Sequence, residues 1–201
     1  LGVRHPTHFE VLVAACFLYF KECRVEYAVI EVGMGGRDDA TNVIPSSVTV
    51  LTNVSLEHTA WLGDTVEEIA EVKSSILKDG TALVTASILP EVIEVLEKAT
   101  LEKNSKLIRV GVDYIPVPSQ IDLTCQKFHL STPNGMINDL EIPLLGVHQV
   151  LNASCAIAAI QQLDDDRMAE DHIRKGLRSV VWPGRFEIME RKPLVILDGA
   201  K

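Results

Sequence analysis

Glu31 and His58 are the two side chains whose types and positions could together hold a metal ion. Glu31 lies near the end of the apolar run 25–32, and His58 follows a second apolar run, 48–54. Ligands of open parallel sheets sit beyond the carboxyl ends of the strands, so neighbouring strand ends would bring these side chains together. A carboxylate and an imidazole would form an oxygen/nitrogen metal site. The simpler alternatives are a solvent-facing carboxylate and an ordinary loop histidine.

Lys73 is a third candidate, because it lies eight residues beyond Thr65 on a predicted helix and could face the same crevice. By residue type alone, a solvated helix lysine is the simpler interpretation. The chain contains no GxxxxGK[ST] loop, so a P-loop gives no argument for ATP binding. The glycine-rich stretch 33–37 lacks the GxGxxG spacing, which weakens a dinucleotide-binding interpretation.

The elements that must position these residues alternate between helices and strands. Thr7 and Glu10 form a capping box that predicts a helix over 7–23, and Thr65 with Glu68 predicts another to about residue 78. Short apolar runs typical of buried parallel strands, and one further helix, complete the pattern. The strands are expected over 25–32, 48–54, 81–85 and 106–110, and the helix over 90–103. This alternation predicts an α/β fold with an open, mostly parallel sheet and helices on both faces.

The pattern changes after residue 115. Short alternating stretches, prolines and the pair Asn134-Gly135 predict a small antiparallel β insert with one hairpin over 115–142. The segments that follow are predicted as helices over 146–163 and 167–177, a linker over 182–185 and a buried strand over 194–197.

Composition narrows the class of protein. The 201 residues are 47% hydrophobic and 23% charged, which excludes a disordered chain. No apolar run reaches the roughly 18 residues of a membrane-spanning helix, so we expect no membrane partner. A net charge of −9 without a Lys/Arg block argues against a nucleic-acid partner. The four cysteines have neither CxxC nor zinc spacing, which predicts reduced thiols in a cytoplasmic protein.

The stretch 31–42 carries a resemblance to a known family. It reads E-V-G-M-G-G-R-D-D-A-T-N and closely resembles the E-V-G-x-G-G-R-x-D-A-T-N signature of folylpolyglutamate and dihydrofolate synthases, the folate branch of the Mur ligase superfamily. Further segments agree with the family in order, so that the resemblance covers nearly the whole chain. They are 7–10, 51–58, 62–65, 69–73, 148–153, 182–185 and 197–200.

This resemblance implies an ATP-dependent amide ligase. Such an enzyme transfers the γ-phosphoryl group of ATP to a carboxylate of folate or dihydropteroate, and the amine of L-glutamate then displaces phosphate from the acyl phosphate. The implied cofactors are ATP and Mg²⁺, with a monovalent cation such as K⁺ as a further candidate. The implied fold is the central, P-loop-type domain of a Mur ligase, in a monomeric protein.

The resemblance also assigns metal-binding and catalytic roles. It implies that Glu31 and His58 are Mg²⁺ ligands. Lys73 matches the lysine that CO₂ carbamylates, which turns a cation into an anionic, metal-orienting group. Lys73 and His58 are therefore the catalytic residues that the resemblance implies, and the solvated interpretation of Lys73 is replaced.

A second set of matched residues concerns the nucleotide. Asn152 matches an asparagine that contacts the nucleotide, with Gln149 and His148 beside it. Arg185 and Asp198 match residues that hold phosphate and ribose at the junction between domains.

Three positions depart from the family pattern. The aspartate that usually precedes the catalytic histidine is Glu57 here. The E-K-A-G-I-I-K sequence around the modified lysine reads V-K-S-S-I-L-K at 72–78. The motif D-G-A-H-N becomes D-G-A-K at 198–201, so that Lys201 stands where the family has histidine.

The resemblance also implies a domain organisation. We expect residues 1–181 to form the central ATP-binding domain without its N-terminal P-loop segment. Residues 182–201 would then be a linker and the first strand of a truncated C-terminal glutamate-ligase domain, and this portion alone should be inactive. Two alternatives stay open: another Mur-type amino-acid ligase, acting on a cell-wall precursor, and a non-catalytic nucleotide-binding remnant.

Overall fold

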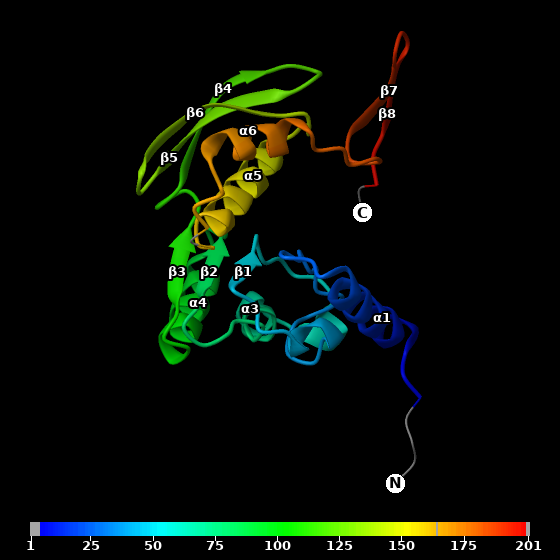
Figure 1. Ribbon diagram of the computed structural model, residues 1–201, viewed down its shortest axis with the longest axis vertical. Helices are drawn as coiled ribbons and strands as arrows, with labels where there is room; N and C mark the ends of the chain where they lie inside the picture. The colour runs from blue at the N-terminus through cyan, green and yellow to red at the C-terminus, as the bar shows by residue number, and fades with distance from the viewer. Residues whose placement is uncertain (1–4, 164, 200–201) are drawn as a thin grey trace.

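Three separate sheets organise the molecule (Figure 1). The computed structural model describes residues 5–163 and 165–199. A parallel sheet of β1, β2 and β3 forms the lower part of the view, and an antiparallel sheet of β4, β5 and β6 forms the upper part. The hairpin β7–β8 makes the third sheet and stands apart from both.

The parallel sheet is the centre of the α/β fold. Its strands are β1 (Val48–Leu51), β2 (Ala82–Thr85) and β3 (Lys106–Arg109), with β2 in the middle. Leu83 of β2 pairs with Thr49 on one side and with Leu107 on the other. All four residues of β2 are buried, as expected of a strand covered on both faces.

Helices cover both faces of this sheet, as the sequence predicts. On one face Leu83 packs in a cluster with Ile69 of α3 (Val66–Ser74) and Leu96 of α4 (Pro90–Glu102). On the other face Val84 packs in a second cluster with Ile157 of α5 (Val147–Ile160). Alternate side chains of one strand therefore enter two different hydrophobic cores.

The antiparallel insert is also confirmed. Its strands are β4 (Ile115–Ile121), β5 (Gln126–Thr132) and β6 (Gly135–Ile142), and Asn134-Gly135 lies at the β5–β6 turn. Phe128 and Leu130 of β5 are fully buried and belong to the same core as α5. α6 (Glu170–Arg178) contributes Ile173 and Leu177 to that core. The insert thus packs on α5 and α6 and does not extend the parallel sheet.

The remaining elements are short, or lie at the surface. α1 (His8–Cys23) begins with the expected Thr7–Glu10 capping box. η1 (Ala40–Val43) and α2 (Thr59–Leu62) are single turns, and β7 (Glu187–Arg191) pairs with β8 (Leu194–Leu197). In the part of the chain that the structure describes, no helix is both long and apolar enough to span a bilayer.

Two predicted buried strands are wrong. Residues 25–32 contain no assigned strand, and Val29 is 99% exposed. Residues 194–197 do form a strand, β8, but all four residues are exposed. An apolar run becomes a buried strand only where other strands and helices cover it. Among the described residues, no strand pairs with 25–32, and β8 has β7 as its single strand partner.

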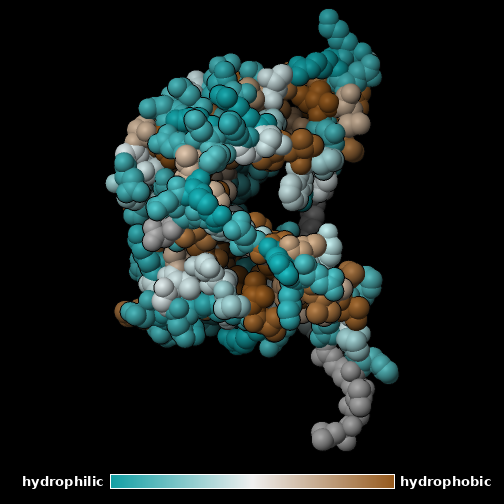
Figure 2. Space-filling model, in the orientation of Figure 1, coloured by the Kyte–Doolittle hydropathy of each residue, from teal (hydrophilic) through white to brown (hydrophobic). Residues whose placement is uncertain are grey.

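Apolar surface is consequently exposed in two regions. Figure 2 shows hydrophobic residues at the surface around α1 and on the β7–β8 hairpin. α1 has no buried residue at all. Several element boundaries also differ from expectation: β1 ends at Leu51, α3 at Ser74 and α5 at Ile160, and α6 begins at Glu170.

Replacing Leu83 should test whether β2 is the central stabilising strand. We expect Leu83→Ala to lower the free energy of unfolding by about 2–5 kcal/mol, because it leaves a cavity in a fully buried site. Val50→Ala, on edge strand β1 at 40% exposure, is the matched control and should cost less than half as much. Urea unfolding followed by circular dichroism measures both. Equal losses would contradict this picture of the core.

Candidate active site

The glycine-rich stretch after Glu31 is a closed loop organised by Asp39. One carboxylate oxygen of Asp39 accepts hydrogen bonds from the backbone N–H groups of Gly33 and Met34, both at 3.0 Å. The other accepts from the N–H and the hydroxyl of Thr41, at 2.9 and 2.5 Å, and so caps η1. Burial raises the pKa of Asp39, but these hydrogen bonds outweigh it and hold the pKa below its usual value.

Lys73 faces the loop that carries His58. Its ammonium nitrogen lies 3.2 Å from Oε1 of Glu57, the residue immediately before His58. The Lys73 side chain is 22% exposed and that of Glu57 is 45% exposed. The helix that positions Lys73, α3, begins with the expected Thr65–Glu68 capping box. The lysine is therefore paired in a partly buried position and does not project freely into solvent.

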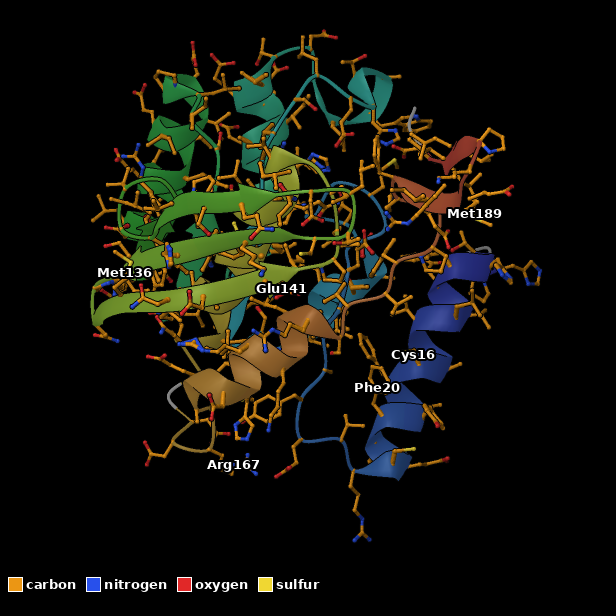
Figure 3. All side chains as sticks on the ribbon, turned by 90° about the horizontal axis from the view of Figure 1, so that it is seen from above. Cys16, Phe20, Met136, Glu141, Arg167 and Met189 are labelled. Atoms are coloured by element: carbon orange, nitrogen blue, oxygen red, sulfur yellow. The ribbon has the colours of Figure 1, made fainter. Side chains whose placement is uncertain are left out.

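His58 and Glu31 are both exposed. His58 is the N-cap residue of α2 and has a left-handed backbone, with φ of 51°. Glu31 lines an apolar hollow together with Cys16 and Phe20. Figure 3 shows Cys16 and Phe20 on α1. Glu31 is therefore not at the end of a buried strand, contrary to expectation. Across the described ranges, no three His, Cys, Asp or Glu side chains form a ready metal site.

A carbamate on Lys73 would change this donor set. It would place two further oxygens beside the carboxylate of Glu57, the residue that precedes His58 in the sequence. Two neighbouring anionic groups repel unless a cation lies between them. The donors beside Lys73 would then be carboxylate and carbamate oxygens, which suit a divalent cation. The residue types therefore fit Mg²⁺ if the lysine is modified.

The predicted nucleotide residues on α5 lie together. The side-chain amide of Asn152 donates to Oε1 of Gln149 at 3.2 Å, one turn earlier on the helix. The ring of His148 lies over Gly146, where an added Cβ would come within 2.5 Å of His148 Cε1. Gln126 of β5, which sequence reasoning missed, donates to the carbonyls of Leu144 and Gly146, both at 2.8 Å. The insert thus fixes the start of α5.

Arg185 and Asp198 lie near the open end of the β7–β8 hairpin. The backbone N–H of Gly199 donates to the carbonyl of Gly184 at 2.7 Å, and Glu187 pairs with Leu197. This pairing brings the segments on either side of the hairpin together. Both predicted residues are exposed. Lys201, the departure from the family histidine, lies outside the described residues.

Two long-range polar contacts have no signal in the sequence. Lys78 donates to the backbone oxygen of Asn42 at 2.8 Å and to its side-chain oxygen at 2.7 Å. Arg167 binds Glu26 at 3.1 Å and lies over the ring of Tyr27. The partners are 36 and about 140 residues apart, so local patterns could not reveal them.

Comparison with known proteins identifies the family. The family model for the Mur ligase middle domain matches residues 3–160. The chain belongs to the Mur ligase middle-domain family, which confirms the resemblance seen in its motifs.

The similar relatives are enzymes of folate metabolism by name. The chain is 36% identical over 200 residues to the dihydrofolate synthase/folylpolyglutamate synthase of Bacillus subtilis, covering 97% of this chain and 46% of the relative. It is also 36% identical to the folylpolyglutamate synthase of Lacticaseibacillus casei, covering 96% and 46%. The chain therefore spans about half the length of the curated relatives it matches.

Solved structures agree with the fold. An FPGS–AMPPCP–folate complex superposes with a TM-score of 0.93 at 36% identity, over 98% of this chain and 48% of that one. Mycobacterium tuberculosis folylpolyglutamate synthase complexed with ADP gives 0.90 at 35% identity, over 97% and 44%. The Mur ligase-type α/β architecture is thus confirmed.

Replacing Asp39 should uncover its role in closing the glycine loop. We expect Asp39→Asn to lower the free energy of unfolding at pH 7 by about 1 kcal/mol. The amide carries no negative charge, and its NH₂ group cannot accept the hydrogen bonds that one carboxylate oxygen accepts now. The pKa of the Asp39 carboxyl is lower in the folded state than its ordinary value of 3.8. Its charge therefore stabilises the folded state fully above pH 3.8, and this stabilisation is lost as pH falls through the folded-state pKa. The difference from the wild type should therefore shrink towards about pH 3.

Urea unfolding at both pH values measures this difference. Asp38→Asn, at the exposed neighbouring position, is the matched control and should be close to neutral at both. A loss for Asp39→Asn that is the same at pH 7 and pH 3 would contradict the role of the charge.

Proposed function

We propose that the protein containing this chain is an ATP-dependent ligase that joins L-glutamate to a carboxylate of folate or dihydropteroate through an acyl phosphate. The observation that carries this proposal is the Lys73–Glu57 contact beside His58, in a chain similar along 97% of its length to a named dihydrofolate synthase/folylpolyglutamate synthase. The similar structures titled as complexes with AMPPCP and folate support the same nucleotide and substrate.

Glu31, His58 and carbamylated Lys73 are the residues that would hold Mg²⁺. When bound, Mg²⁺ neutralises charge on the transferring phosphoryl group. Carbamylation forms a bond between the neutral amine nitrogen of Lys73 and the carbon of CO₂, and releases one proton to water. Lys73 is partly buried and lies 3.2 Å from Glu57, so the modified group would be held beside a carboxylate.

The nucleotide-binding roles belong to two separate segments. Gln149 and Asn152 present amide groups on the exposed side of α5, where they would hydrogen-bond the nucleotide. Arg185 would pair with phosphate, because a guanidinium forms charge-assisted bonds to phosphate oxygens, and Asp198 would accept from ribose hydroxyls. The exposure of both hairpin residues is compatible with contact to a bound ligand.

We also propose a domain boundary between residues 181 and 182. Residues 1–181 would form the central ATP-binding domain, and 182–201 the start of a C-terminal ligase domain. The β7–β8 hairpin supports this, because its sheet is separate from the other two. The expected single strand is in fact a pair of strands.

The four free cysteines are compatible with a cytoplasmic location.

Lys73→Ala tests the proposed chemistry in the complete protein. We expect ligase turnover to fall by about 100-fold or more, because an essential oxygen donor is removed. Acetate or formate should restore part of the activity by occupying the vacated space. Lys98→Ala, at an exposed site on α4, is the control and should behave as the wild type. Unchanged turnover for Lys73→Ala would refute the carbamate assignment.

Glu31→Gln tests the metal assignment separately. Since Glu31 is exposed, the variant should keep the stability of the wild type while the Mg²⁺ concentration for half-maximal activity rises by about tenfold or more. A magnesium titration of ligase activity measures the shift, and Glu97→Gln on α4 is the matched exposed control. An unaltered magnesium dependence would remove Glu31 from the site.

A further inference from the structure

The glycine-rich loop packs against the helix that carries Lys73. Gly35 and Gly36 are both buried. A Cβ added to Gly36 would lie 2.6 Å from the backbone oxygen of Val72 and 3.0 Å from that of Lys73 itself. Gly35 has a φ of +74°, and its Cβ would lie 2.9 Å from Leu62. Gly36 thus allows a close contact between the loop backbone and the backbone of α3, whereas Gly35 packs against side chains in a left-handed conformation that favours glycine.

Hydrogen bonds of Lys78 connect this loop with residues next to the parallel sheet. Its ammonium group donates to both oxygens of Asn42, the last residue of the 31–42 signature, at 2.7 and 2.8 Å. Its own carbonyl accepts from the hydroxyls of Thr81 and Ser105, at 2.8 and 3.0 Å. Thr81 directly precedes β2, and Ser105 directly precedes β3. One residue therefore connects the bases of two strands with the end of the loop.

The loop is closed from within as well. The side-chain amide of Asn42 donates to the carbonyl of Arg37 at 3.2 Å, and Asp39 binds the N–H groups of Gly33 and Met34. These bonds join Asn42 to the middle of the loop and Asp39 to its start. The position of Asn42 is thereby coupled to that of Gly36, which contacts the backbone of α3 at Val72 and Lys73.

We propose that Lys78 is a positioning residue for Lys73. By binding Asn42, it holds the glycine loop against the end of α3 and so fixes the direction in which Lys73 reaches Glu57. The proposal rests on the proposed function, since it assumes that Lys73 supports ligation. Gly36 then serves a backbone contact to α3, the helix that carries Lys73.

Replacing Lys78 in the complete protein provides the test. We expect Lys78→Met to lower kcat about tenfold or more while the KM for ATP changes less than about twofold, because small misplacements of a catalytic group reduce turnover strongly. Lys78→Arg keeps the charge and should restore most of kcat. Lys103→Met is the control, because the ammonium of Lys103 forms an exposed ion pair with Asp79, the residue after Lys78, whereas that of Lys78 binds Asn42. It should match the wild type.

A direct measurement of Lys73 separates positioning from simple stabilisation. With ¹³C-labelled bicarbonate, the carbamate NMR signal that Lys73→Ala abolishes should weaken in Lys78→Met and recover in Lys78→Arg. Should Lys78→Met fail to fold, Asn42→Ala keeps the backbone acceptor and should show the same loss to a smaller degree. A folded Lys78→Met with the kcat and carbamate signal of the wild type would overturn the proposal.

The same experiments distinguish a failure of the proposed ligase function from a failure of the positioning role of Lys78. A wild-type protein without ligase activity, or an active Lys73→Ala variant, would overturn the proposed function. An active wild type and an inactive Lys73→Ala, combined with a fully active Lys78→Met, would overturn the positioning role alone.

Discussion

Burial of β2 on both faces is the constraint on which the rest of the structure depends. Its side chains enter two different cores, one with α3 and α4 and the other with α5 and the antiparallel insert. A strand that is covered twice fixes the two helical layers relative to each other. The helix with the candidate catalytic lysine, α3, and the helix with the candidate nucleotide residues, α5, therefore lie on opposite faces of one strand.

The polar part of the site is built outward from this apolar centre. Lys73 is aligned from two sides, because α3 packs on the sheet while the glycine loop meets the backbone at its end. Its ion pair with Glu57 then connects α3 with the segment after β1. Neither the loop nor the ion pair would hold its geometry without the buried strand beneath them. Packing of α3 on the sheet holds the helix in place, and polar contacts fix the direction of the Lys73 side chain.

Sequence patterns predicted what is decided locally. The Thr7 and Thr65 capping boxes and the Asn134-Gly135 turn are set by neighbouring residues, and all three occur where expected. The strand predicted over 25–32 failed because burial depends on partners that the pattern of the run does not contain. The Lys78–Asn42 contact could not be predicted because its partners are 36 residues apart and meet only in the folded chain. By residue type alone Lys73 would be a solvated helix lysine, and its contact with Glu57 depends on the path of the chain after β1, which no local pattern contains.

The tie between Arg167 and the segment after α1 makes the molecule unevenly sensitive to ionic strength. α1 has no buried residue, and the chain that follows it is held by exposed charges, with Arg167 62% and Glu26 70% exposed. Dissolved salt screens such pairs over about 8 Å at physiological concentration, whereas it leaves dry apolar contacts largely intact. Added salt should therefore loosen α1 and its following segment well before it affects the parallel sheet. The hollow beside Glu31 is lined by α1 and by residues 29–31, so its shape depends on the surrounding electrolyte as well as on the fold.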